Sequence, residues 1–129
     1  MFKLFKSESK IIKQTTVLLR EQIDEAMPDN NLWREKFGSK FVLGYITGFS
    51  VILIKSKTKN EKETASGTQK VFENLFGKDR GMRIMQTANI YQKAEEFQNG
   101  LEQARLDLIE FIDNNGKRPD GLKNFLKNI

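Results

Sequence analysis

Carboxylates are the side chains whose spacing could do chemistry in this chain. They gather between residues 95 and 113, at Glu95, Glu96, Glu102, Asp107, Glu110 and Asp113. Asp107, Glu110 and Asp113 lie three residues apart, so on a helix they drift slowly along one face and could hold Mg²⁺ through oxygen ligands. A di-iron site in a helix bundle normally adds a Glu-x-x-His pair, and the chain has no histidine. We therefore interpret these carboxylates as a solvated helix face and expect neither a metal site nor a cofactor site.

The missing residue types restrict catalysis further. With no histidine, the usual general base near neutral pH, the commonest transition-metal ligand and any Ser-His pair are all excluded. With no cysteine, disulfides, thiolate nucleophiles and sulfur-bound zinc are excluded too. No glycine motif for phosphate binding follows a predicted strand. The composition therefore favours a protein that is not an enzyme, and the lack of cysteine fits a cytoplasmic location.

Basic residues form the other candidate for binding. Residues 1–62 hold twelve Lys and Arg against seven acids, whereas residues 63–129 hold ten of each, so the net charge of +5 arises in the first half. The candidate polyanion-binding residues are Lys55, Lys57, Lys59, Lys62, Lys78, Arg80 and Arg83. Nucleic-acid binding needs such cations on one surface, with exposed aromatic rings for base stacking. Because the phenylalanines have the spacing of core residues, nucleic-acid or polyanion binding is the second hypothesis rather than the first.

The apolar stretch Phe41–Ile54 decides the fold class. Its fourteen residues carry no formal charge, and Lys40 and Lys55 close it at both ends. As a helix it would span about 21 Å, against about 30 Å for the hydrocarbon core of a bilayer, so it is too short to cross a membrane. Two strands are the alternative, but no Asn-Gly or Asp-Gly turn joins them. The stretch predicts a buried central helix, with Gly44 and Gly48 as points where another helix crosses closely.

Amphipathic helices are expected around this central helix. The periodic apolar residues and turn signals place them at Ser9–Met27, Leu32–Phe37, Thr64 or Ser66 to Phe76, residues 82–112, and Pro119 to the end. Pro28 stops the first helix. In residues 82–112 apolar side chains recur about every 3.4 positions, from Met82 to Phe111 and Ile112. Asn99 and Gly100 interrupt this pattern, which predicts either two helices separated there or one long helix bent at Gly100.

A single domain follows from the length of 129 residues. The prediction is an all-α bundle of five or six helices around the central one, with residues 1–8 as a flexible N-terminal stub. The stub, MFKLFK, also leaves open contact with an anionic membrane surface. The leading functional hypothesis is a non-catalytic protein–protein interaction or regulatory module with an unidentified protein partner. The near-heptad spacing of residues 82–112 suits a homodimer.

Overall fold

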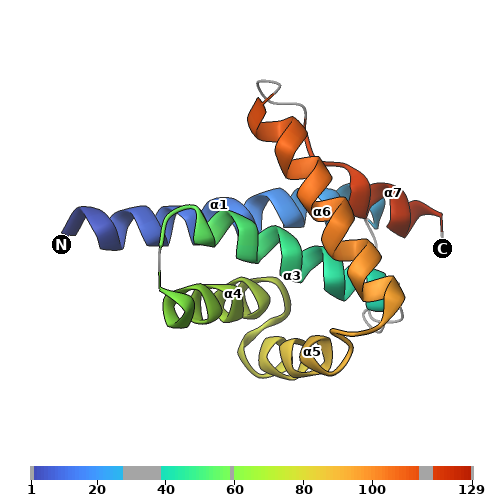
Figure 1. Cartoon of the computed structure of the whole chain (residues 1–129), viewed down its shortest axis with the longest axis horizontal. Coiled ribbons are helices and arrows are strands. Elements are labelled where there is room, and N and C mark those ends of the chain that lie inside the picture. Colours follow the sequence, from blue (N-terminus) through green and yellow to red (C-terminus); the bar gives the residue numbers. More distant parts are fainter. Residues whose placement is uncertain (1, 28–38, 59, 114–117, 129) are drawn as a thin grey trace.

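The computed structural model describes residues 2–27, 39–58, 60–113 and 118–128, and all regular structure within them is helical (Figure 1). The helices are α1 (Phe2–Ala26), α3 (Lys40–Lys55), α4 (Glu61–Phe76), α5 (Lys78–Ile90), α6 (Glu95–Asp113) and α7 (Gly121–Lys127). The predicted all-α bundle is confirmed. The short helix expected at Leu32–Phe37 lies outside the described residues.

Helix α3 lies at the centre of the bundle, where the apolar stretch of the sequence placed it. Ser39 caps its start, because the Ser39 hydroxyl accepts a hydrogen bond from the backbone N–H of Val42 at 3.4 Å. Tyr45 and Phe49 are fully buried, and α3 contacts every other described helix, α6 most extensively. The two-strand alternative is therefore wrong. Within the described residues, no helix is long and apolar enough to cross a bilayer.

Glycines allow α3 and α6 to cross at close range. A Cβ atom on Gly44 would overlap the backbone carbonyl oxygen of Phe97, and one on Gly100 would overlap the carbonyl oxygen of Phe41. A Cβ on Gly48 would lie 3.1 Å from the Cα of Leu101. Because main-chain atoms cannot move aside as flexible side chains do, any larger residue at this crossing would push the two helices apart.

The break in the long apolar pattern falls at residues 91–94, and both predictions for Asn99 and Gly100 are wrong. Helix α5 ends at Ile90, and the N–H of Ala94 then donates to the carbonyl of Tyr91 at 2.9 Å to close a turn. Gly100 lies inside α6, buried against α3. Gly100, which the sequence indicated as a helix break, is required for the close packing of α6 on α3. The sequence of α6 alone does not show this contact.

Four further helix starts differ from the sequence prediction, and one of them is that of α5, which begins at Lys78 instead of residue 82. Helix α1 begins at Phe2 instead of Ser9, since nothing between these residues is a proline or glycine that would oppose a helix. The stretch expected as a flexible stub is therefore helical from Phe2 on. Helix α4 begins at Glu61 because the Asn60 side chain accepts a hydrogen bond from the Lys62 N–H at 2.8 Å and caps it. Helix α7 begins at Gly121, shortly after Pro119.

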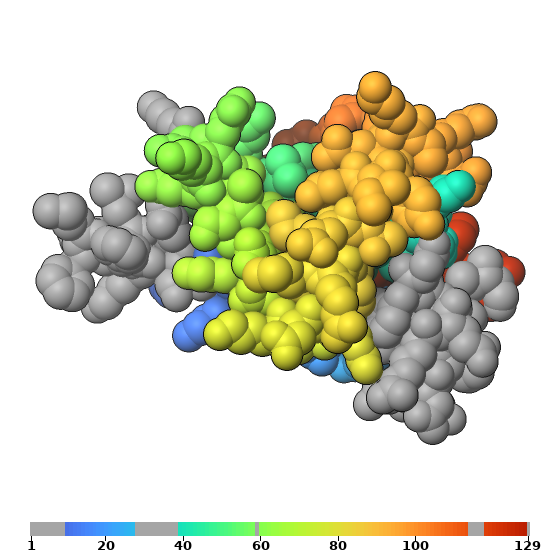
Figure 2. All heavy atoms as spheres, turned by 90° about the horizontal axis from the view of Figure 1, so that it is seen from below, coloured from blue at the N-terminus to red at the C-terminus, as the bar shows by residue number. Residues whose placement is uncertain are grey.

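A tight corner joins α4 to α5. Gly77 adopts φ 93°, a conformation that residues with a Cβ rarely adopt, and it follows Phe76, where α4 ends as the sequence predicted. Immediately afterwards, Gly81 packs against the backbone of Phe72 and Glu73. The two helices consequently share one broad face of the molecule, which Figure 2 shows with α4 in green and α5 in yellow.

Every described helix contributes to the core. Its largest fully buried side chains are Leu19 from α1, Leu43, Tyr45, Ile46 and Phe49 from α3, Phe72 from α4, Phe97 and Leu108 from α6, and Leu122 and Leu126 from α7. Helix α5 contributes Ala88 and the half-buried Ile84 and Met85. The bundle leaves two parts projecting in Figure 1, namely the start of α1 and the end of α6.

Candidate functional site

Asp107 of α6 is a charged residue that is buried, unlike the other charged side chains that the structure describes. Its side-chain oxygens accept hydrogen bonds from the Tyr45 hydroxyl at 2.5 Å, the Gln103 amide at 2.8 Å and the Gly121 backbone N–H at 2.9 Å. Only 8% of the residue is exposed. The expectation that Asp107 belongs to a solvated helix face is therefore wrong. Three donors from α3, α6 and the start of α7 converge on it instead.

Gln22 extends this polar cluster to α1. Its amide donates to the Tyr45 hydroxyl at 3.0 Å, and its carbonyl oxygen accepts from the backbone N–H of Lys123 at 3.0 Å. Burial raises the pKa of Tyr45, and its hydrogen bond to the Asp107 carboxylate raises that pKa further, so the hydroxyl keeps its proton. Each of these buried groups already has its partners. The cluster thus joins four helices and leaves no reactive group free.

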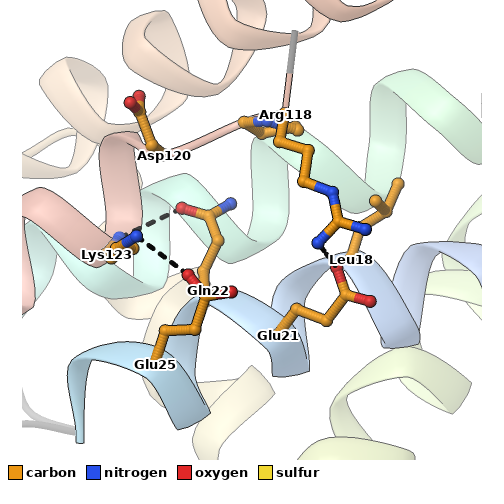
Figure 3. A pocket seen from close by; sticks show the side chains of 8 residues that line it. Leu18, Glu21, Gln22, Glu25, Arg118, Asp120 and Lys123 are labelled. Carbon is orange, nitrogen blue, oxygen red and sulfur yellow. Dashed lines mark hydrogen bonds and ion pairs between the residues drawn. The ribbon is translucent and has the colours of Figure 1, made fainter. Parts of the chain in front are cut away.

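A shallow cleft of about 320 Å³ lies beside this cluster, between α1 and the segment that begins α7 (Figure 3). Four of the five charged residues that line it form two ion pairs across the cleft. Lys123 Nζ lies 2.8 Å from a carboxylate oxygen of Glu25, and the Arg118 guanidinium lies 3.3 Å from Glu21. The pairing with Lys123 lowers the pKa of Glu25, whose carboxylate stays ionised. The two ion pairs connect α1 to α7 and the residues before it, and Asp120 is the one charged lining residue outside them.

The remaining predicted carboxylates do not assemble. Within the part of the chain that the structure describes, no three acidic side chains come close enough to hold a metal ion. Glu102 pairs instead with Arg105 on the same helix, at 2.5 Å. Glu95, Glu96 and Asp113 are exposed on α6. These residues do lie on one helix, as their spacing predicted. Spacing along one helix is not enough to bring three carboxylates close enough to bind a metal ion.

The candidate polyanion-binding residues fall into two groups. Lys55, Lys57 and Lys62 are exposed where α3 ends and α4 begins, whereas Lys78, Arg80 and Arg83 are exposed on α5. The first group lies at the start of α4, whereas the second lies beside the later part of α4, where Gly81 packs against Phe72 and Glu73 (Figure 2). Lys59 lies outside the described residues. The six described cations therefore lie in two groups, one at the α3–α4 connection and one on α5. Gly44 and Gly48, for their part, lie against backbone at the α3–α6 crossing.

Three aliphatic side chains near the end of α6 face solvent. Leu106, Ile109 and Ile112 are 45%, 42% and 59% exposed, on the part of α6 that projects from the bundle in Figure 1. They lie three residues apart, so they follow one another along the helix. We call these three residues the α6 apolar face. The other exposed large apolar residues, Val17, Met82 and Ile90, lie on α1 and α5.

Sequence reasoning missed both the α6 apolar face and the Asp107 cluster. It grouped Ile112 with the buried stripe, although Ala104 and Leu108 form that stripe and Leu106 and Ile109 lie off it. The signal in the sequence was that the apolar residues of α6 form two series, one containing Ala104 and Leu108 and the other containing Leu106 and Ile109. For the cluster, the signal was Gln22, a polar residue inside the apolar stripe of α1. A polar side chain at a core position requires a buried partner.

Comparison of the chain with protein-family models, curated proteins and solved structures finds no significant match.

Proposed function

We propose that this protein is a non-catalytic interaction module that binds another protein chain through the α6 apolar face. The observation that carries the proposal is the exposure of Leu106, Ile109 and Ile112 on a projecting helix end. Contiguous apolar side chains rimmed by charged residues are typical of protein-binding surfaces. Glu102 and Arg105 supply such a rim here. As part of the same proposal we place the protein in the cytoplasm, because it lacks cysteine.

The physical support is the cost of leaving these side chains in water. Burying apolar area stabilises a complex by about 25 cal/mol per Å², and aliphatic residues on a rigid helix lose little conformational freedom on binding. Leu106 and Ile109 lie on the side of α6 away from Ala104 and Leu108, whereas Ile112 follows Leu108 by one turn and is exposed near the end of the helix. The α6 apolar face is therefore free to contact another chain without disturbing the bundle.

A matched pair of variants tests the proposal. Tagged wild-type chain and the variants Ile109→Glu and Ile90→Glu would be recovered from their native cells after mild cross-linking, and the co-purifying proteins quantified. Ile90 is the control because it is also an exposed isoleucine, 78% exposed, but lies on α5. We expect Ile109→Glu to lose the wild-type partners and Ile90→Glu to retain them.

Two results would contradict the proposal. The first is partner recovery that is identical for both variants and the wild type. The second is a metal-dependent turnover by the purified protein that Glu110→Gln abolishes. That result would place catalytic chemistry on the acidic residues of α6.

Polyanion binding is the second candidate. It rests on the exposure of six basic residues, in two groups of three, at the α3–α4 connection and on α5. Because each group can neutralise only a few phosphates, binding to nucleic acid by this route would be weak and strongly salt-dependent. Equal retention of the chain on a DNA and RNA resin at low and high salt would exclude it.

A further inference from the structure

We propose that the partner of the α6 apolar face is a second copy of this chain, docked with the two α6 helices antiparallel and their two-fold axis beside Ile109. This inference deepens the proposed function and rests on it. A two-fold dimer uses the same surface on both copies, so the surface must be complementary to itself. The residues of α6 satisfy that condition in both shape and charge.

The apolar residues of the two copies lie opposite each other in this arrangement. In an antiparallel pair centred on Ile109, residues at equal distances before and after that position lie opposite each other. Ile109 then meets its own symmetry copy, and Leu106 of one chain lies opposite Ile112 of the other. All three exposed aliphatic side chains of each copy are covered at once.

The charged residues match in the same arrangement. Arg105 lies four residues before Ile109 and Asp113 four residues after it, so each Arg105 lies opposite Asp113 of the second copy. Asp113 is exposed, and within the described residues no cation pairs with it. Arg105 pairs with Glu102 at 2.5 Å, but a guanidinium has five N–H donors and can bind both carboxylates. The dimer therefore gains two ion pairs between chains.

A different antiparallel register matches less well. With the two-fold axis between Asp107 and Leu108, Leu106 would lie opposite Ile109, and Glu102 would lie opposite Asp113. Two like charges would then face each other, and Ile112 would lie opposite Gln103 instead of an apolar residue. Charge and apolar matching both favour the register centred on Ile109.

Because the α6 apolar face is small, we expect the dimer to be weak. Three side chains on each copy bury much less than the roughly 1,200 Å² of a typical stable interface. We therefore expect a reversible dimer with a dissociation constant above about 1 µM. Sedimentation velocity of the intact chain from about 10 µM to about 1 mM should show the dimer fraction rise with concentration.

Charge reversal tests the pairing of Arg105 with Asp113. Arg105→Asp and Asp113→Arg each place like charges opposite each other at both symmetry-related positions, and each should weaken the dimer about tenfold. The double variant restores opposite charges and should recover most of the wild-type affinity. It does not restore the pair with Glu102, so recovery cannot come from that contact. Failure of the double variant to recover would overturn the proposed register.

Cysteine cross-linking tests the position of the two-fold axis. The chain has no cysteine, so Ile109→Cys introduces a single thiol next to its own symmetry copy. In a glutathione buffer this variant should form a disulfide-linked dimer at least about tenfold faster than Ile90→Cys. Equal rates, or a wild-type chain that stays monomeric up to about 1 mM, would overturn the second copy as partner. If Ile109→Glu nevertheless loses a different protein from the native cells, the proposed function stands while the dimer falls.

Discussion

At the scale of single residues, Asp107 is a buried carboxylate that accepts hydrogen bonds from two other helices of the bundle. Tyr45 from α3 and Gly121 beside α7 both donate to it, at 2.5 and 2.9 Å. Gln103, one turn earlier on α6, donates at 2.8 Å. A buried carboxylate with three donors holds its neighbours in one arrangement, because any other arrangement would leave a buried polar group without a partner.

Replacing Asp107 should therefore destabilise the protein strongly. We expect Asp107→Ala to lower the free energy of unfolding by about 3 kcal/mol, since it leaves the Tyr45 hydroxyl and the Gly121 N–H without their acceptor. Urea denaturation followed by circular dichroism measures the change. Glu102→Ala is the matched control on the same helix, because Glu102 is exposed, and it should change the stability by less than about 0.5 kcal/mol. Equal losses of unfolding free energy in the two variants would show that the hydrogen bonds of Asp107 contribute no more to stability than the exposed Glu102 side chain does.

Tyr45 should make the stability depend on alkaline pH. Its pKa is raised in the folded chain by burial and by Asp107, so above about pH 10 the unfolded chain loses a proton that the folded chain keeps. Folding then binds a proton, and stability falls as the pH rises, by up to about 1.4 kcal/mol per pH unit from this group. Tyr45→Phe lacks this contribution.

The measurement is the difference in unfolding free energy between wild type and Tyr45→Phe at several pH values. We expect a constant difference below about pH 9 and a shrinking one above about pH 10. Parallel pH profiles for the two proteins would mean that Tyr45 ionises as easily in the folded chain as in the unfolded one.

At the scale of elements, the α3–α6 crossing depends on glycines more than on any apolar pair. Gly44→Ala should cost about 3 kcal/mol of stability, because the added methyl group overlaps the backbone of Phe97 and cannot be accommodated by a side-chain rotation. Thermal or urea unfolding measures this. Gly67→Ala is the control in α4, where the nearest atoms are methyl carbons of Ile54 at 3.1 Å, and its effect should stay within about 1 kcal/mol of zero.

Most elements were predictable from the sequence, and their boundaries less so. The apolar run of α3 and the lysines at its two ends identified the central helix, since both signals are local. Gly100 misled the prediction because its role depends on Phe41, which is far away in the chain. Asn60 was not recognised as the cap of α4, so that helix was expected to start later.

The candidate sites were less predictable than the helices. Residue spacing correctly put Asp107 on a helix, but its burial depends on Tyr45 and Gln22 from two other helices. The candidate cations were visible in the sequence, but their division into one group at the α3–α4 connection and another on α5 was not. A site is formed by residues from several segments of the chain. A single sequence without a match to known proteins carries little information about which segments lie close together in space.

At the scale of the whole molecule, the separation of the basic groups limits how polyanions bind. If nucleic acid contacts only one group, three or four phosphates are neutralised, and the logarithm of affinity should fall with the logarithm of salt with a slope of about −3. All seven cations acting together would give a slope near −6. Fluorescence anisotropy with a labelled DNA duplex between about 50 and 200 mM salt measures the slope. The steeper value would show that both groups bind at once.

The contact between α1 and α7 has a consequence for synthesis of the chain. Gln22 and the Lys123 N–H that binds it are separated by 101 residues, and the fully buried Leu122 and Leu126 belong to α7, which packs on α1. While a ribosome is still making the chain, the α7-facing side of α1 remains uncovered until the residues of α7 have emerged. Nascent chains arrested before residue 118 should therefore be better chaperone substrates than the released protein.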